Sequence, residues 1–232
     1  MRTRFLMAVA VFCFTGVSFG AFLLEPPIII FNASVNEKVA WVEVVHTGGP
    51  PMAVELSVVD RRVDMDGENV TTGLNRAPHF AVNPAQVILR PGQRQRVQVV
   101  YSGPGRVTSD KTYNLFSREV MLPIGDDDEG VRTGINTLVS YYTVIAFETG
   151  RPGSLTFVSS RALGGGMIEV IVENRSRGRV QGGDNLVITI GGNEKIRAFT
   201  GKKNSILPGE RRRFTFPYSR AVTGREITFG AN

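Results

Sequence analysis

The sequence predicts an all-β protein built from two β-sandwich domains. Runs rich in β-branched and aromatic residues alternate with clusters of Gly, Pro, Asn and Asp, at a spacing of about 8–14 residues that is typical of sandwiches. No run shows a sustained helical period with capping residues at its ends. The turn-forming segment ETGRPG (148–153) separates two sets of runs. We therefore expect one domain at 21–149 and a second at 153–232.

The start of the chain has the pattern of a secretory signal peptide at residues 1–20. Two arginines precede an apolar stretch, and Ser18 and Gly20 occupy the −3 and −1 positions before Ala21. The apolar stretch is shorter than the roughly 20 residues that a membrane-spanning helix needs. We expect cleavage before Ala21 and no stable membrane insertion. An uncleaved amphipathic anchor is the alternative.

Composition limits what holds the mature chain together and what it binds. Cys13 is the only cysteine, so the 212 residues from Ala21 onward contain none and must be stabilised by hydrophobic cores. Cleavage lowers the formal net charge from +6 to +4, with 25 basic and 21 acidic residues remaining. The basic clusters, Lys202–Lys203 and Arg211–Arg213, lack interleaved aromatic residues. We expect solvated basic faces there and no nucleic-acid partner.

Seven strands are predicted in the first domain. The first, FLLEPPIIIF (22–31), is broken by Pro26-Pro27, which restricts it to a sheet edge or a kink. DMDGEN (64–69) is expected to be a polar loop. The other strands are, in chain order, KVAWVEVVH (38–46), MAVELSVVDRR (52–62), FAVNPAQVIL (80–89), QRVQVVY (95–101), KTYNLFSREVML (111–122) and INTLVSYYTVIAF (135–147).

The second domain is predicted to contain six shorter strands joined by glycine-rich turns. Glycine suits such turns because it adopts positive φ without a steric penalty. The strands are SLTFVSSR (154–161), MIEVIVEN (167–174), NLVITIGG (185–192), KIRAFT (195–200), RRRFTFP (211–217) and REITFG (225–230).

Residues that carry catalytic or metal chemistry are scarce. His46 and His79 lie 33 positions apart on different predicted strands, whereas zinc requires three or four ligands together. Neither a Gly-x-Ser-x-Gly elbow nor a phosphate-binding loop is present. The acidic run DDDE (126–129) lacks the alternate spacing of calcium loops and is expected to be a solvated loop tip. We expect no metal, no cofactor and no enzymatic activity.

Three segments resemble the periplasmic chaperones of the chaperone–usher pilus pathway. They are FAVNPAQVILRPGQRQRVQVVYSG (80–103), KTYNLFSREVMLP (111–123) and ILPGERRRFTFP (206–217). Their order is kept over nearly the whole mature chain, and YYTVIAF (141–147) is similar to the divergent archaic branch. The resemblance implies two immunoglobulin-like domains in a boomerang arrangement, a periplasmic location, and pilus or fimbrial subunits and an outer-membrane usher as partners.

In that family the last strand of the first domain is donated to a subunit that lacks a strand of its own, which is a form of β-augmentation. The resemblance assigns this role to 135–147, with Leu138, Tyr142 and Val144 facing the subunit. Both faces of the strand carry apolar residues, whereas a strand with one solvated face should alternate. A central strand covered on both sides is the alternative. The expected subunit-binding residues are Leu138, Val139, Ser140, Tyr141, Tyr142 and Val144.

At two sets of positions this sequence departs from the residue types of the family pattern. The basic pair that anchors the subunit's terminal carboxylate aligns with Ile28 and Ile145, neither of which is basic. The interdomain ionic set aligns with Glu119 and Arg151, and its third member falls near Asn232. The resemblance therefore implies an ion pair between Glu119 and Arg151 at the domain junction.

The rival interpretation is a secreted immunoglobulin-like structural or adhesive surface protein, or a pilus subunit. A subunit should carry an N-terminal donor extension and often a disulfide, and the sequence shows neither. We therefore expect a chaperone that binds pilus subunits and delivers them to an usher.

Overall fold

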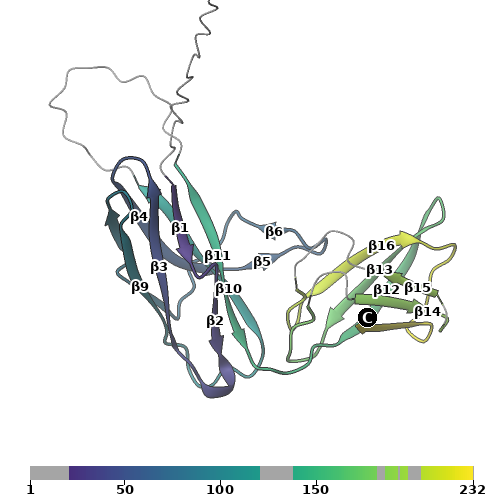
Figure 1. The fold of residues 1–232 in the computed structure, drawn as a ribbon. Coiled ribbons are helices and arrows are strands. Elements are labelled where there is room, and N and C mark those ends of the chain that lie inside the picture. Colours follow the sequence, from purple (N-terminus) through teal and green to yellow (C-terminus); the bar gives the residue numbers. More distant parts are fainter. Residues whose placement is uncertain (1–20, 121–137, 182–185, 193, 198–204, 232) are drawn as a thin grey trace, which may run out of the picture.

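The computed structural model describes residues 21–120, 138–181, 186–192, 194–197 and 205–231. These residues form strands arranged as two bodies that meet at an angle (Figure 1). Among them, the one helical segment is the 3-10 turn η1, Ala33–Val35. The prediction of an all-β, two-sandwich, boomerang-like fold is confirmed.

The first sandwich packs a four-stranded sheet against a five-stranded sheet. The four-stranded sheet has the order β1 (Ala21–Glu25), β3 (Val39–Gly48), β9 (Arg94–Tyr101) and β7 (Phe80–Asn83). The five-stranded sheet has the order β2 (Ile28–Asn32), β11 (Ser140–Glu148), β10 (Lys111–Val120), β4 (Met52–Asp60) and β8 (Gln86–Leu89). Neighbouring strands are antiparallel except β2 and β11, which are parallel.

The two prolines of the first predicted strand divide it between the two sheets. Pro26 and Pro27 separate β1, which pairs with β3, from β2, which pairs with β11. Both pieces lie at a sheet edge, as predicted, because proline has no N–H to donate to a ladder.

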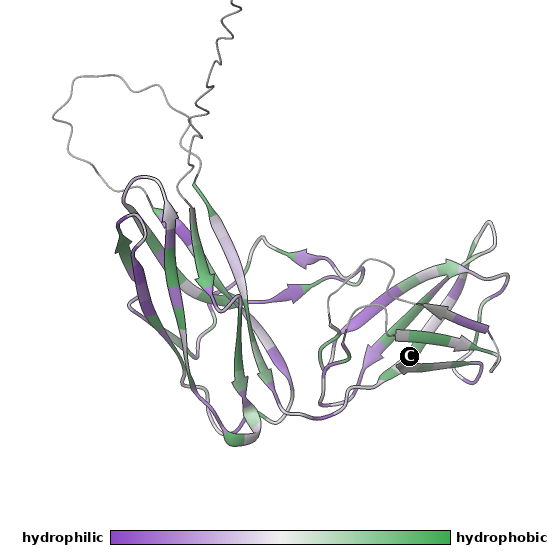
Figure 2. Cartoon of the chain, viewed as in Figure 1, coloured by the Kyte–Doolittle hydropathy of each residue, from purple (hydrophilic) through white to green (hydrophobic). Residues whose placement is uncertain are grey.

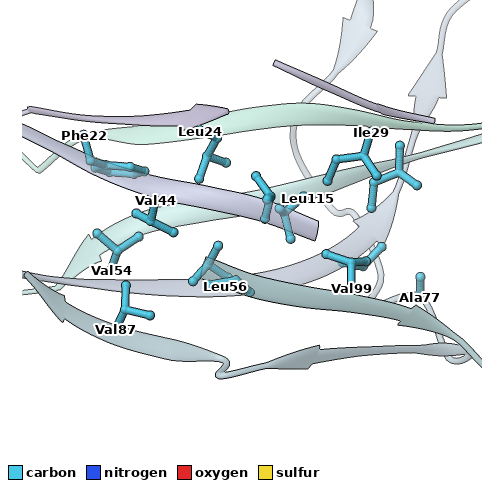
Figure 3. Packing of buried hydrophobic residues seen from close by; sticks show 14 of the residues in the cluster. Phe22, Leu24, Ile29, Val44, Val54, Leu56, Ala77, Val87, Val99 and Leu115 are labelled. Carbon is cyan, nitrogen blue, oxygen red and sulfur yellow. The ribbon is translucent and has the colours of Figure 1, made fainter. Parts of the chain in front are cut away.

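The core of the first sandwich lies between its two sheets (Figure 3). On β3, Val42 and Val44 are buried, whereas Trp41, on the opposite face of the strand, is 44% exposed. Phe31 and Phe147 stack in the core with ring centroids 4.8 Å apart. Each fully buried aliphatic or aromatic side chain contributes about 1.5–3 kcal/mol relative to the exposed side chain.

The second sandwich is smaller and has its own core. One sheet contains β12 (Leu155–Gly164), β13 (Met167–Asn174) and β16 (Arg211–Pro217), and the other contains β15 (Glu194–Arg197), β14 (Leu186–Ile190) and β17 (Ile227–Ala231). β12, β13 and β16 are antiparallel neighbours, as are β15, β14 and β17. The core side chains that they share are Ile168, Val170, Val172, Ile188, Ile190, Ile206, Phe214, Phe216, Val222 and Ile227.

Three sequence predictions require correction. The single strand expected at FAVNPAQVIL (80–89) is two strands, β7 and β8, which belong to different sheets. DMDGEN (64–69) is more than a loop, because it joins β5 (Arg62–Val63) to β6 (Asn69–Val70) in a separate two-stranded hairpin. The cluster Arg211–Arg213 is not a uniformly solvated face, because Arg212 is 2% exposed. The predictions for 126–129, Lys202–Lys203 and Asn232 lie outside the described residues.

Candidate functional site

The first half of β11 has an unpaired edge. β10 runs along one side of β11 from Ser140 to Phe147, but β2 covers the other side only from Val144 to Glu148. No described strand lies beside Ser140–Thr143 on that side. An unpaired edge presents backbone N–H and C=O groups that can pair with another chain.

The side chains of β11 alternate between its two faces. Ile145 and Phe147 point into the core and are 0% and 2% exposed. Leu138, just before β11, and Tyr142 point away from the core and are 52% and 40% exposed. A β-strand places alternate residues on opposite faces, so Ser140 and Val144 share the outer face with them.

The six residues expected to bind the subunit therefore divide into two groups. Leu138, Ser140, Tyr142 and Val144 lie on the outer face. Val139 packs against the core, and Tyr141 meets the buried Phe22 edge to face, with ring centroids 5.0 Å apart. Leu138, Tyr142 and Val144 thus share one face of the strand, the face that the family resemblance assigns to the subunit.

Exposed apolar side chains continue from β11 onto β2. Ile28 and Ile30 are 51% and 52% exposed, and Ile28 lies opposite Val144 in the parallel pairing. On the other side, the Tyr142 ring packs 5.0 Å from the ring of Phe116. We call Leu138, Tyr142, Val144, Ile28 and Ile30 the apolar strip. Figure 2 colours β2 as predominantly hydrophobic. Contiguous exposed apolar surface of this kind marks interaction sites.

The two aligned anchor positions are not equivalent in the structure. Ile28 is exposed beside β11, but Ile145 is fully buried in the core and cannot contact a partner. The residue that faces Ile28 across the two strands is Val144. Ile28 and Ile145 therefore point to different faces of the five-stranded sheet, because one step along a strand reverses the face.

The expected ion pair between Glu119 and Arg151 is also wrong. The Glu119 amide bonds to Val139 at one end of the β10–β11 hairpin, whereas Lys111 lies opposite Phe147 at the other end, close to residue 151. Eight strand residues separate Glu119 from Lys111, a distance of roughly 27 Å. Among the described residues, Oε2 of Glu119 is buried without a hydrogen-bond partner, and the side chain of Arg151 forms no ion pair.

Other residues form the polar contacts at the junction. Asp110, 6% exposed, accepts hydrogen bonds from the Thr149 amide at 2.8 Å, the Thr149 hydroxyl at 2.6 Å and the Arg179 amide at 2.9 Å. Arg179 also pairs with Glu148 at 2.6 Å. Sequence reasoning missed these residues because Asp110 and Arg179 are 69 positions apart. An isolated Asp just before a predicted strand was the only available signal.

Close backbone packing strengthens the same junction. A Cβ atom on Gly178 would lie 2.0 Å from the carbonyl oxygen of Arg151, and one on Gly153 would lie 2.3 Å from that of Arg179. These distances are far below van der Waals contact, so both positions require glycine.

A hollow of about 740 Å³ opens between β12 and β17 in the second sandwich. Its lining is mostly apolar, with Leu155, Phe157 and Phe229 among the residues. Arg179 is the one charged residue in the lining, and it is paired with Glu148. No described group in this lining pairs a nucleophile with a base.

The described histidines have structural surroundings. His46 is 1% exposed, and its Nε2 lies 2.8 Å from the Pro50 carbonyl while its Nδ1 accepts from the Gly48 amide at 3.0 Å. His79 packs edge-on to Tyr101. Within the described ranges, no group of three or more His, Cys, Asp or Glu residues could hold a metal ion. In the same part of the chain, no helix has the length and apolar character needed to cross a membrane.

Comparison with solved structures shows which fold this is. The chaperone DraB of E. coli is similar over 92% of this chain and 96% of its own, with a TM-score of 0.56 and 15% identity. The chain has the fold of the pilus chaperones. No family model and no curated protein matches the sequence.

Two further similar structures are complexes. A SafA pilin–SafB chaperone complex of Salmonella enterica matches with a TM-score of 0.54 and 15% identity, over 93% of this chain and 98% of that one. The CsuC–CsuE chaperone–tip adhesion subunit complex of the archaic Csu pili of Acinetobacter baumannii matches with a TM-score of 0.54 and 12% identity, over 84% and 89%. The resemblance inferred from sequence motifs is confirmed at the level of the fold.

Proposed function

We propose that this protein is a periplasmic chaperone that binds pilus or fimbrial subunits by strand addition and delivers them to an outer-membrane usher. The observation that carries the proposal is the unpaired edge at Ser140–Thr143, bordered by the apolar strip, in a fold shared with pilus chaperones. On this proposal residues 1–20 are removed on export, 21–149 form the subunit-binding domain and 153–232 form the second domain.

The edge defines the kind of partner that it fits. A partner strand would pair its backbone with Ser140–Thr143 and place apolar side chains against the apolar strip. The outward residues Leu138, Tyr142 and Val144 would enter the partner's groove. Tyr142 brings a hydroxyl that already donates to the Thr71 carbonyl at 3.2 Å, so its ring can be buried without losing a polar partner.

The magnitudes show where the binding free energy must arise. Each main-chain hydrogen bond contributes about 0.5–1.5 kcal/mol net. Completing the burial of a half-exposed Leu or Tyr adds about 1 kcal/mol. Association costs about 4–15 kcal/mol in lost freedom. The edge alone therefore binds weakly, and a tight complex requires the subunit to bury its own groove residues around the strand.

The test is Leu138→Glu in a chain co-expressed with a small secreted subunit encoded beside this gene. A carboxylate in an apolar groove carries a penalty of several kcal/mol, and each ~1.4 kcal/mol is a tenfold loss of affinity. We expect the variant to lose the subunit in co-purification. Because Leu138 is 52% exposed, the substitution should change the free energy of unfolding of the chaperone itself by less than about 0.5 kcal/mol.

Ile88→Glu is the matched control. Ile88 is 62% exposed on β8, at the opposite edge of the same five-stranded sheet. The control should retain the subunit. A folded Leu138→Glu variant that also retains the subunit would reject binding through this edge. Delivery to an usher is tested separately, by recovery of a chaperone–subunit complex on the co-expressed usher.

A further inference from the structure

The β5–β6 hairpin leaves the first sandwich and has a well-defined tip. The Asp64 amide bonds to the Glu68 carbonyl at 2.9 Å, and Oδ1 of Asp64 accepts from the amides of Asp66 and Glu68 at 2.9 and 2.8 Å. Gly67 closes the turn at a φ of 89°, which only glycine adopts readily. These bonds fix the shape of the tip independently of its surroundings.

The tip contacts the second sandwich. The Arg213 amide on β16 donates to the Met65 carbonyl at 2.7 Å. The Arg213 guanidinium lies 3.4 Å from Asp66 and 3.1 Å from Glu169 on β13, so it links the hairpin to the sheet. Figure 1 shows the hairpin crossing from the first body to β16.

The position of this contact follows from the sheet order. Among the described strands, β16 lies at the edge of its sheet and pairs only with β13. Because Arg213 donates outward, residues 215 and 217 of the same strand direct their backbone nitrogens outward as well. Residue 217 is a proline, whose nitrogen carries no hydrogen. It is tolerated there because an outward-facing nitrogen takes no part in the ladder to β13. The Arg213 amide is thus available to a chain that approaches the edge.

Arg212, beside the contact, is buried. Burial lowers the pKa of Arg212, and the charges of Glu210, Asp64 and Asp66 oppose that effect. Burial likewise lowers the pKa of Arg61, which precedes the hairpin. Acidic side chains of the hairpin therefore lie near the buried Arg212, whereas the Arg213–Asp66 pair itself is exposed to solvent, with side-chain exposures of 37% and 51%. Exposed ion pairs of this kind contribute little, so the Met65–Arg213 backbone bond is the main contact.

The base of the hairpin is held by the first sandwich. Arg61 donates to the Thr112 hydroxyl of β10 at 3.4 Å, and Tyr142 of β11 donates to the Thr71 carbonyl at 3.2 Å. The chain then returns to β4, where the Ala77 amide donates to the Val58 carbonyl at 2.9 Å. Both ends of the hairpin are thus attached to β-sheets, one in each sandwich.

We propose that the β5–β6 hairpin is a strut that holds the two sandwiches at one angle. The linker and the Asp110 contacts form one attachment between them, around which they could rotate. The Met65–Arg213 contact forms a second attachment away from the linker, and two separated attachments restrict rotation. This inference does not depend on subunit binding.

The test compares two proline variants of β16. Arg213→Pro removes both the amide donor and the guanidinium but leaves the ladder to β13 intact, because that amide points outward. Thr215→Pro is the matched control, with the same parity on the same strand and an exposed side chain. Spin labels at Gln86→Cys and Thr228→Cys, both exposed positions, report the distance between the sandwiches in a chain that also carries Cys13→Ala.

We expect Arg213→Pro to widen the inter-label distance distribution at least twofold and Thr215→Pro to leave it unchanged. An unchanged distribution in Arg213→Pro, or equal widening in both variants, would overturn the strut. A second measurement needs no β16 variant. In the parent chain the Arg213 amide should exchange with solvent at least tenfold more slowly than the Thr215 amide, and equal rates would also overturn the proposal.

Discussion

The face assignment of β11 is tested most simply by truncating two neighbouring residues. Ile145 is 0% exposed and belongs to the first core, whereas Val144 lies on the outer face and is partly exposed. Ile145→Ala removes three carbons from a packed interior and leaves a cavity. Changes of this kind cost about 2–5 kcal/mol.

Val144→Ala should cost much less. It removes two carbons from a side chain that water already reaches, for a loss of about 1 kcal/mol. With a urea dependence of about 2 kcal/mol per M, Ile145→Ala should lower the unfolding midpoint by about 1–2.5 M and Val144→Ala by about 0.5 M.

The fluorescence of Trp41, the only tryptophan, reports unfolding of the first sandwich alone. Equal midpoint shifts, or a larger shift for Val144→Ala, would refute the assignment. A slip of one residue would turn Leu138, Tyr142 and Val144 toward the core and remove them from the proposed subunit-binding face.

Three further predictions concern the junction and the second sandwich. Asp110→Ala leaves three donors without their acceptor and should lower the unfolding free energy by about 3 kcal/mol in urea, whereas Asp110→Asn should lose less. Gly178→Ala would place a Cβ 2.0 Å from the Arg151 carbonyl oxygen, so we expect a clear fall in the melting temperature. Bonds from Arg220 lower the pKa of Glu226 to about 2, so its stabilising contribution should persist above pH 4.5 and disappear as the pH falls toward 2. Arg220→Ala should raise the NMR titration midpoint of Glu226.

Local patterns predicted the strands and their faces well. The first strand is broken at Pro26-Pro27, as predicted. On β3, the buried Val42 and Val44 alternate with the more exposed Trp41 and Glu43, because a half-buried strand has a period of two. The three arginines at 90, 94 and 96 are exposed, as expected for a polar outer face. Arg94 pairs there with Glu25 and Glu43, and Arg96 lies over the Trp41 ring.

Long-range geometry could not be read from the same patterns. Glu119 and Arg151 were paired through an alignment, but an antiparallel hairpin carries residues 111 and 119 to opposite ends. The junction contacts of Asp110 depend on the approach of a segment 69 residues away. The unpaired edge at Ser140–Thr143 arises because the parallel β2 begins only at Ile28, opposite Val144, and this register does not follow from strand propensity.

The hairpin at 62–70 was missed for a related reason. Its polar composition, DMDGEN, is that of a solvated loop. Its order comes from bonds within the turn and from contact with Arg213 in the other sandwich, neither of which appears as hydrophobic periodicity.

The central claim, that a subunit strand pairs with the free edge of β11, is tested most directly by amide hydrogen exchange at Ser140–Thr143 with and without bound subunit. We expect at least tenfold slower exchange in the complex for those amides of this segment that point away from β10, with little change at the β8 edge. Unchanged exchange at Ser140–Thr143 in a stable complex, with new protection elsewhere, would contradict it.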